Sequence, residues 1–411
     1  MQTSLADFIR DTPEGREADA ILRKCVHCGF CTATCPTYQL LGDELDGPRG
    51  RIYLIKQALE GNEITARTQL HLDRCLTCRA CESTCPSGVE YGRLADIGRK
   101  VVEERVSRGP WQKIQRAALS AVLPRTRVFG ILLAIGRAVR PILPRALADK
   151  VPARGEATGA WPPPRHVRRM LVLAGCVQPV LAPAINAAAA RVLDRLGISL
   201  VEGESAGCCG AVRFHMNRQA AGKADARALI DAWWPQVEAG AQAVVMTASG
   251  CGTMVKEFGH LLRHEPAYAA KAARISALTR DLSEVLASER AGLEKILGGR
   301  HAVKRKIAFH SPCSLQHGQK IQGAVEPLLE LAGFELTPVA DAHLCCGSAG
   351  TYSILQPELA RQLRVNKLAA LHAGMPEEIA TANIGCLTHL ASGTQARVLH
   401  WVQLLDRRLA R

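Results

Sequence analysis

The spacing of apolar positions divides the chain into a helical first part and a second part with short strands. Ile52, Ile55 and Leu59 recur at helical spacing, and residues 18–24 form another helical stretch just before the first cysteine. Beyond residue 166 the apolar residues gather in short runs that are typical of buried strands. These runs cover residues 170–174, 243–246, 306–309 and 379–383.

The strand-like runs form two sets with the same internal order. In each set a predicted helix ends at a glycine, Gly197 or Gly333, and a strand and a Cys-Cys-Gly sequence follow. The order strand, helix, strand, helix, strand predicts a parallel α/β sheet in each set. The fold class is therefore α+β and multidomain, with a helical domain followed by two repeated α/β domains.

Four cysteines recur in the two sets at a nearly constant offset of 135 or 137 residues, which indicates a duplicated domain. Each follows a predicted strand, and ligands gather at the carboxyl ends of parallel strands. We therefore predict a candidate additional metal site in the repeats, with a redox-active thiol set and plain buried cysteines as the alternatives. The residues are Cys176, Cys208, Cys209 and Cys251 in the first copy, and Cys313, Cys345, Cys346 and Cys386 in the second. His310 and His343 lie near them, although each is more typical of a hydrogen-bonded core histidine.

The helical part contains two copies of the motif C-x2-C-x2-C-x3-C-P. A loop of this spacing brings three thiolates to one [4Fe–4S] cluster, and in two-cluster proteins the fourth thiolate comes from the other copy. Zinc also binds four thiolates, but its usual sites pair two C-x2-C motifs. We predict one cluster at Cys25, Cys28, Cys31 and Cys85, and a second at Cys75, Cys78, Cys81 and Cys35.

The net charge of +14 is concentrated between Lys100 and Arg169, where 15 Lys or Arg face four acids. No nucleic-acid motif accompanies this charge, which favours a docking surface over nucleic-acid binding. No uninterrupted apolar run is long enough to span a membrane. Residues 128–143 read as an amphipathic helix that packs on its own protein, on a partner or on an anionic membrane. Charged residues interrupt the first 24 positions, so we expect no signal peptide and reduced thiols in the cytoplasm.

Several segments resemble known iron–sulfur proteins. The first part resembles the helical two-cluster ferredoxin domain of respiratory dehydrogenases, and residues 42–51 resemble its D-x-P-R-G-R turn, with Arg49 and Arg51 near a cluster. The repeats resemble the cysteine-rich CCG domain of heterodisulfide reductases. There the repeat ends in C-x2-C, whereas here Met254 and His389 occupy the last position. The predicted domains are 1–105 (ferredoxin-like), 106–166 (basic helical linker), 167–290 and 300–411 (CCG repeats).

As a whole, the order of parts resembles the iron–sulfur subunits of bacterial glycolate oxidases. The resemblance implies an electron-transfer subunit of a 2-hydroxyacid dehydrogenase complex, with FAD on a partner subunit and a quinone-type acceptor. It also implies a cytoplasmic location, with peripheral attachment to the inner membrane as an option. No nucleotide-binding motif occurs in the chain, so no catalytic residue is assigned here. The alternatives are a lactate or glycerol-3-phosphate dehydrogenase subunit, a disulfide-reducing subunit with a CCG-bound cluster, and a redox sensor.

Overall fold

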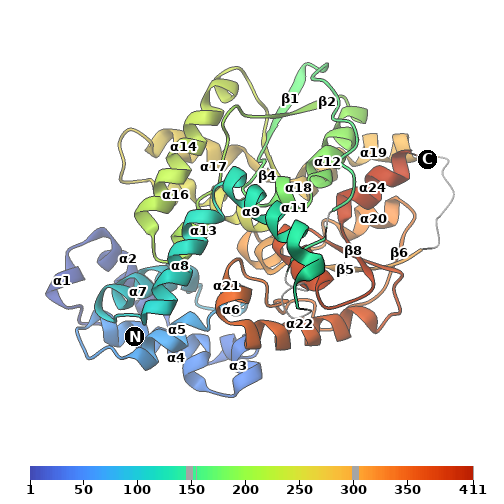
Figure 1. Cartoon of the computed structure of the whole chain (residues 1–411). Helices are drawn as coiled ribbons and strands as arrows, with labels where there is room; N and C mark the ends of the chain where they lie inside the picture. Colours follow the sequence, from blue (N-terminus) through green and yellow to red (C-terminus); the bar gives the residue numbers. More distant parts are fainter. Residues whose placement is uncertain (145–150, 154, 299–304, 411) are drawn as a thin grey trace. The chain divides into compact units, whose positions relative to one another are not determined.

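The computed structural model describes residues 1–144, 151–153, 155–298 and 305–410 (Figure 1). The chain forms two compact units. The N-terminal unit contains Met1–Ala117 and His343–Lys367, and the sheet unit contains Ala118–Ala342 and Leu368–Arg411. The start of the predicted second repeat at residue 300 and parts of the predicted linker, 145–150 and 154, lie outside the described residues.

The N-terminal unit is helical, as the apolar spacing predicts. Helix α2 begins with a Thr12 side-chain cap and Pro13 at its first position, which is the position where proline is favoured. The core contains Ile21, Leu22, Ile55 and Leu94, all with at most 2% of their surface exposed. Its main elements are α1 (Asp7–Arg10), α2 (Pro13–Lys24), η1 (Phe30–Thr32), α3 (Pro36–Leu41), η2 (Glu44–Asp46), α4 (Pro48–Leu59), α5 (Ala66–Asp73), α6 (Ala80–Thr84), α7 (Tyr91–Arg105) and α21 (Tyr352–Leu355).

The sheet unit holds two parallel four-stranded sheets with the same topology. The strand orders are β2-β1-β3-β4 and β6-β5-β7-β8, so each sheet has the second strand at one edge. This identity of order confirms the predicted duplication. The strands are β1 (Arg168–Val172), β2 (Ile198–Glu202), β3 (Val244–Met246), β4 (Thr279–Asp281), β5 (Lys306–His310), β6 (Glu335–Leu336), β7 (Glu378–Thr381) and β8 (Arg397–His400).

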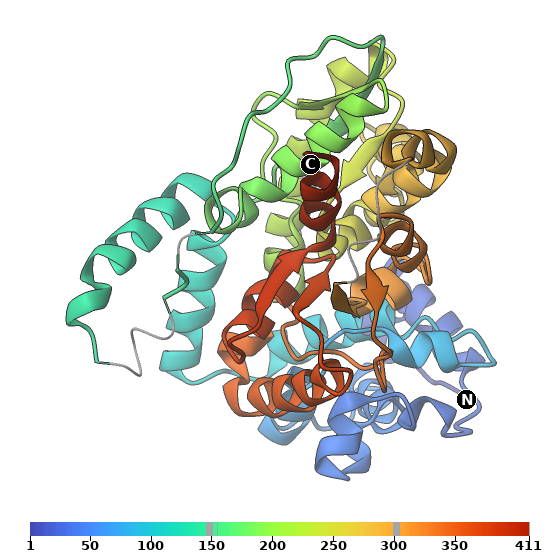
Figure 2. The ribbon, with the colours of Figure 1, turned by 90° about the vertical axis from the view of Figure 1, so that its right-hand side faces the viewer.

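Helices connect the parallel strands in the manner of βαβ units (Figures 1 and 2). Helix α12 (Ala184–Arg195) joins β1 to β2 and is buried along most of its length, because five alanines let it pack closely. Gly197 and Gly333 have positive φ angles and end the helices before β2 and β6, as predicted. Other helices of the unit are α11 (Gln178–Leu181), α13 (Ala211–His215), α14 (Gln219–Glu238), α15 (Ser249–Lys256), α16 (Phe258–Leu261), α17 (Ala269–Leu278), α18 (Leu282–Ser288), α19 (Arg290–Leu297), α20 (Glu326–Leu331), α23 (Ile384–Ala391) and α24 (Trp401–Ala410).

Residues 110–142 form helices α8 (Pro110–Val122), α9 (Thr126–Val139) and η3 (Arg140–Ile142). Within the described residues, no single helix is long and apolar enough to cross a membrane. The stretch 110–122 followed by 126–142 passes the test of length and composition only as a pair, and the pair is bent by 111°. The amphipathic helix predicted over residues 128–143 is thus present as α9 and η3.

Candidate metal centres

The first hollow in the N-terminal unit is lined by the thiols of Cys25, Cys28, Cys31 and Cys85, together with Cys81. It contains about 440 Å³ of space not filled by protein atoms. Cys25 ends helix α2 and Cys85 ends helix α6, so the two motifs contribute to the hollow from different elements. The structure therefore brings together the four cysteines predicted for the first cluster.

A second hollow, of about 310 Å³, is lined by Cys35, Cys75, Cys78 and Cys81. These are the four cysteines predicted for the second cluster. Cys81 lines both hollows, so the two sites are adjacent within one unit. Cys35 thus lies with the cysteines of the second motif, and Cys85 with those of the first.

The two cysteine loops have the same backbone conformation. In the first loop His27 and Gly29 have positive φ angles of 55° and 86°, and in the second Thr77 and Arg79 have 53° and 61°. These are the same two positions relative to the first cysteine of each motif. A non-glycine residue in this region is strained, and such strain is typical of functional sites. Here it turns three thiols of each loop toward one hollow.

The spacing of the thiols argues against a single metal ion. None of the eight cysteines belongs to a group of three or more ligand atoms that all lie within 4.8 Å of one another. Thiolates at about 2.3 Å from one tetrahedral zinc ion would be closer together than this. Ligands that surround a core of several irons are spread more widely, so the residues present fit a cluster.

The electrostatics of the free thiols also fit a cationic core. Burial, together with the neighbouring Cys25, raises the pKa of Cys31 to about 11. Burial likewise raises the pKa of Cys81, helped by Cys78 and Cys75. Packing several thiolates together is thus unfavourable without positive charge between them. Bound metal supplies that charge and stabilises the thiolate form.

Arginines lie around the second hollow. Arg51 is 1% exposed and donates hydrogen bonds to the His71 carbonyl at 2.8 Å, to Thr37 Oγ1 at 3.1 Å and to Asp46 Oδ1 at 3.3 Å. Thr37 Oγ1 in turn lies 3.4 Å from the Cys35 sulfur. Arg51, which was predicted to lie near a cluster, is thus linked to Cys35 through the hydroxyl of Thr37.

Cys75 shows the effect of this positive environment. Burial raises the pKa of Cys75, but Arg51 and Arg99 outweigh it, so that the pKa is lowered. The Tyr91 hydroxyl lies 3.6 Å from the Cys75 sulfur as a donor, and Arg99 donates to the Cys75 carbonyl at 2.6 Å. Our sequence interpretation missed Tyr91 and Arg99, because no motif links them to the cysteines, and it gave no role to Asp46, the first residue of the D-x-P-R-G-R turn. They lie beside the site only through the packing of α4 and α7.

Further arginines lie at the two hollows, with Arg49 lining the first and Arg79 lining the second. Arg49 donates to the His27 carbonyl at 3.4 Å and forms an ion pair with Glu44. Arg79 pairs with Glu82, which also accepts from the Gly92 backbone. Arg74 pairs with buried Asp46. These arginines thus fix the turns that carry the cysteines.

In the first repeat the structure brings the four cysteines together in a row. The thiol of Cys208 is hydrogen-bonded to those of Cys176 and Cys209, and Cys209 is hydrogen-bonded to Cys251. They follow the carboxyl ends of β1, β2 and β3, as predicted. Hydrogen bonds from Cys176 and Cys209 hold the pKa of Cys208 well below its usual range, and Arg213 contributes.

The Cys-Cys-Gly turns of the two repeats are alike. Gly210 and Gly347 have φ angles of +84° and +89°, and their backbone N–H groups point at the sulfurs of Cys208 and Cys345, each at 3.4 Å. A residue with a side chain would be strained at either position, which explains why both repeats have a glycine there. The two glycines thus let the chain turn sharply after each Cys-Cys pair.

The predicted cysteines of the second repeat fall into both units. Cys313 and Cys386 belong to the sheet unit, whereas Cys345 and Cys346 belong to the segment His343–Lys367 of the N-terminal unit. The Asn383 amide donates to the Cys386 sulfur at 3.5 Å, and its oxygen accepts from the Gly250 backbone. His310 is buried, and its Nδ1 lies 2.9 Å from the Thr381 hydroxyl.

The fold and the sites define an iron–sulfur protein built from a dicluster domain and a duplicated cysteine-rich domain. Residues 21–89 match the family described as 4Fe-4S dicluster domain, and residues 170–256 and 307–391 match the family described as Cysteine-rich domain. Both matches cover the cysteines discussed above.

Full-length relatives identify the family. The chain is 57% identical to the glycolate oxidase iron-sulfur subunit of Escherichia coli K12, over all of this chain and 99% of that protein. It is 30% identical to the probable glycolate oxidase iron-sulfur subunit of Bacillus subtilis 168, over 93% of both chains. Lactate utilization protein A of Bacillus licheniformis is 26% identical over 57% of this chain and 97% of its own length. The chain belongs to the family of glycolate oxidase iron–sulfur subunits.

Proposed function

We propose that this chain is the electron-transfer subunit of a complex that oxidises glycolate to glyoxylate. Electrons leave FAD on a partner subunit one at a time, cross this chain and reach a quinone-type acceptor. The observation that carries the proposal is the pair of adjacent four-cysteine hollows in one unit. Two neighbouring sites for one-electron carriers suit a relay better than a structural role. The substrate is inferred from the names of the full-length relatives.

The residues that line each hollow support the proposed assignment of cluster ligands. Cys25, Cys28, Cys31 and Cys85 would hold one [4Fe–4S] cluster, and Cys35, Cys75, Cys78 and Cys81 the other. Each cluster, when bound, supplies a site that accepts and releases a single electron. The protein supplies the burial and the hydrogen bonds that set the reduction potential.

The residues around the second hollow favour its reduced state. The positive charges of Arg51 and Arg99 and the Tyr91 hydroxyl stabilise added negative charge there. At the first hollow, Arg49 is 37% exposed, so water screens its charge more than that of the buried Arg51. We therefore expect the second cluster to have the higher potential and to be the later carrier of the two.

The relay is tested with Cys28→Ser and Cys78→Ser in the assembled complex. Each variant should lose electron transfer to the acceptor while glycolate still bleaches the flavin of the partner subunit. Val26→Ala is the matched control, because Val26 lies exposed in the same loop and is not a thiol. If an assembled cysteine variant also loses flavin reduction, the electron relay is the wrong description of this chain.

We also propose that the cysteine row of the first repeat binds metal, as a further iron–sulfur cluster. Support comes from the hydrogen-bonded series of thiols Cys176, Cys208, Cys209 and Cys251 at the carboxyl edge of one sheet. Packed thiols of this kind are stabilised by a metal cation.

Iron and acid-labile sulfide content, measured on anaerobically purified protein, tests this second site. Two cubanes account for about eight irons per chain, and a further cluster raises the number to about twelve. The additional iron and its paramagnetic resonance signal should disappear in Cys209→Ser and persist in Cys28→Ser. About eight irons without zinc in the wild-type protein would contradict a metal in the repeats. A signal that changes when a disulfide substrate is added would favour the disulfide-reducing alternative.

A further inference from the structure

Helix α9 presents an apolar face to solvent. Ile131, Leu132 and Ile135 are 62%, 49% and 55% exposed, and Val128 and Ile142 are exposed as well. Their spacing places them along one side of the helix, three and four residues apart. Isolated apolar residues on a surface are ordinary, but a continuous helical stripe marks an interaction site.

The opposite face of α9 is fixed to the sheet unit, so this exposure is a stable feature. Leu133 is buried, and Gly130 faces Val180 of α11. Arg137 donates to the carbonyls of Pro152 and Ala153 at 3.0 and 2.9 Å. The helix cannot bury its apolar stripe by rotation without breaking these contacts. In Figure 2, α9 is drawn at the left, with no other helix or strand of the sheet unit beyond it.

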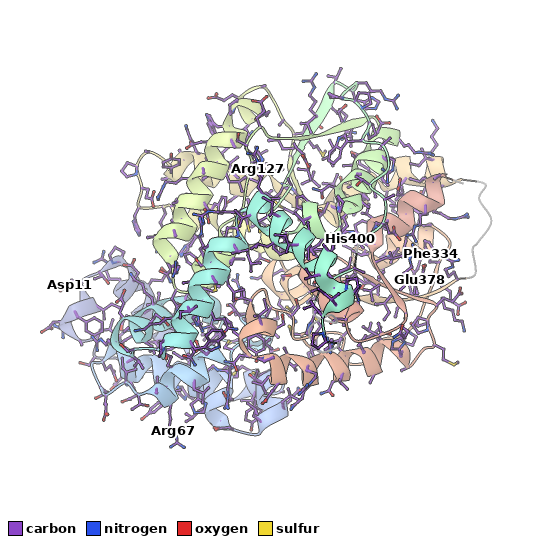
Figure 3. All side chains as sticks on the ribbon, viewed as in Figure 1. Asp11, Arg67, Arg127, Phe334, Glu378 and His400 are labelled. Atoms are coloured by element: carbon purple, nitrogen blue, oxygen red, sulfur yellow. The ribbon has the colours of Figure 1, made fainter. Side chains whose placement is uncertain are left out.

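The charge around the stripe has one sign. In the sheet unit, α9 and the described residues that flank it, 118–144, contain four arginines (Arg125, Arg127, Arg137 and Arg140) and no Asp or Glu. Arg125 and Arg127 are exposed at the beginning of α9, where the helix dipole adds positive charge (Figure 3). Polar rims of protein interfaces carry residues of both signs, whereas an anionic lipid surface selects for cations beside an apolar helix face.

We propose that α9 is the docking helix of this chain on an anionic lipid bilayer. The side chains of Val128, Ile131, Leu132 and Ile135 enter the boundary between headgroups and acyl chains, and Arg125 and Arg127 pair with lipid phosphates. The biological purpose of this docking rests on the proposed function. A quinone acceptor dissolves in the bilayer, so docking would bring the electron relay to its acceptor. Lipid binding itself requires neither substrate nor partner.

Vesicle flotation of the purified full-length chain tests the proposal. Wild-type protein should float with vesicles of equal parts phosphatidylglycerol and phosphatidylcholine, and at least tenfold less with phosphatidylcholine alone or at high salt. Ile131→Ser combined with Ile135→Ser should lower binding to the anionic vesicles about tenfold. Arg125→Gln combined with Arg127→Gln should remove the preference for anionic lipid.

Matched controls use the same substitutions elsewhere on the surface. Ile354 and Val365 are exposed apolar residues, and Arg67 and Arg274 are exposed arginines. Serine at the first pair and glutamine at the second should leave flotation unchanged. Circular dichroism establishes that each variant is folded. Failure of the folded wild-type protein to bind anionic vesicles overturns the proposal, as does equal binding by the α9 variants. Loss of partner-subunit binding in those variants, with vesicle binding intact, would instead make this face a protein interface.

Reduction of a water-soluble quinone analogue by the complex, measured without vesicles, separates docking from relay. The α9 variants should keep this activity, since α9 carries no cluster ligand. Vesicle binding without quinone reduction in the wild type would refute the relay and leave docking intact. Quinone reduction without vesicle binding would refute docking alone.

Discussion

Arg51 and Asp46 form an ion pair that is removed from water, at 1% and 0% exposure of the side chains. The pair persists because further hydrogen bonds and a second ion pair surround it. Asp46 also accepts from Arg74 at 2.8 Å, and Arg51 donates to the His71 carbonyl and to Thr37. Burial lowers the pKa of Arg51, but negative charge on Cys75 and other neighbours outweighs it, so this guanidinium stays protonated. Buried ion pairs add little stability by themselves, but losing one partner is costly.

Arg51→Met should therefore destabilise the N-terminal unit by about 3–5 kcal/mol, because it removes one charge of a buried pair. Denaturant unfolding followed by circular dichroism and by loss of iron–sulfur absorbance measures the effect. Arg49→Met is the control, since Arg49 and Glu44 are 37% and 40% exposed and such pairs contribute at most about 1 kcal/mol. Equal effects of the two substitutions would show that the buried network is not what stabilises this region.

Helices α4 and α7 pack closely because α7 has a glycine at the point of contact. A Cβ atom on Gly98 would lie 2.5 Å from Cγ1 and 2.8 Å from Cγ2 of Ile55. A second glycine, Gly50 of the R-G-R sequence, also has no room for a side chain, because its Cβ would lie 2.1 Å from the Glu44 carbonyl oxygen. The glycine of the D-x-P-R-G-R turn is thus required by the close approach of η2 to α4.

Gly98→Ala should destabilise the contact between α4 and α7 by about 1–3 kcal/mol through overpacking. Faster hydrogen–deuterium exchange in peptides from both helices is the measurement. The control is Gly130→Ala in α9, where the nearest atom to the new Cβ is 3.5 Å away. That change should leave exchange the same or slow it, because alanine is the better helix former by up to about 1 kcal/mol. Slower exchange in Gly98→Ala would contradict the packing argument.

The strands show where apolar patterning works and where it fails. The four predicted runs correspond to β1, β3, β5 and β7, which lie inside the sheets and are buried along most of their length. The fourth strands, β4 and β8, were not predicted. Thr279–Asp281 and Arg397–His400 carry charged or polar residues at both ends, because they lie at the sheet edge and end next to the other repeat. Edge strands need no continuous apolar run.

At the scale of the sheet unit, the two repeats are joined through the carboxyl ends of their sheets. His400 Nε2 donates to the Thr247 carbonyl of the first repeat at 2.8 Å, and its Nδ1 accepts from the Val402 backbone. Ser249 and Ser314 share a hydrogen bond at 2.7 Å, and Asn383 accepts from Gly250. His400, labelled in Figure 3, is fully buried and must be neutral to make both of its bonds.

Burial lowers the pKa of His400 to about 4. The unfolded chain, with an ordinary histidine pKa, therefore binds a proton between about pH 6.5 and pH 4 that the folded chain does not. The contribution of neutral His400 is present above about pH 6.5 and is lost as the pH falls through about 4. The loss amounts to about 3 kcal/mol.

Denaturant unfolding at about pH 7 and about pH 4.5 measures this loss. His400→Gln should lose about 2–3 kcal/mol less than the wild type over this interval, because glutamine does not titrate. Comparing the two proteins at each pH cancels the acid lability that both share. His264→Gln, at an exposed histidine, should behave like the wild type. The same pH dependence in wild type and His400→Gln would exclude His400 as the source.

The sequence by itself determined the helical and duplicated sheet domains, the family and the two sets of cysteines with cluster spacing, because each of these rests on local periodicity or on short motifs. The assignment of ligands and of a metal in the repeats stays a prediction. Only the tertiary structure decided that Tyr91 and Arg99 lie beside the second hollow and that Asp46 pairs with Arg51 there, since these residues lie 6 to 14 residues from the nearest motif cysteine and outside the cysteine loops. It also decided which face of α9 is buried. Amphipathic spacing shows that a helix has an apolar side, but the side that packs is set by its partners in the fold.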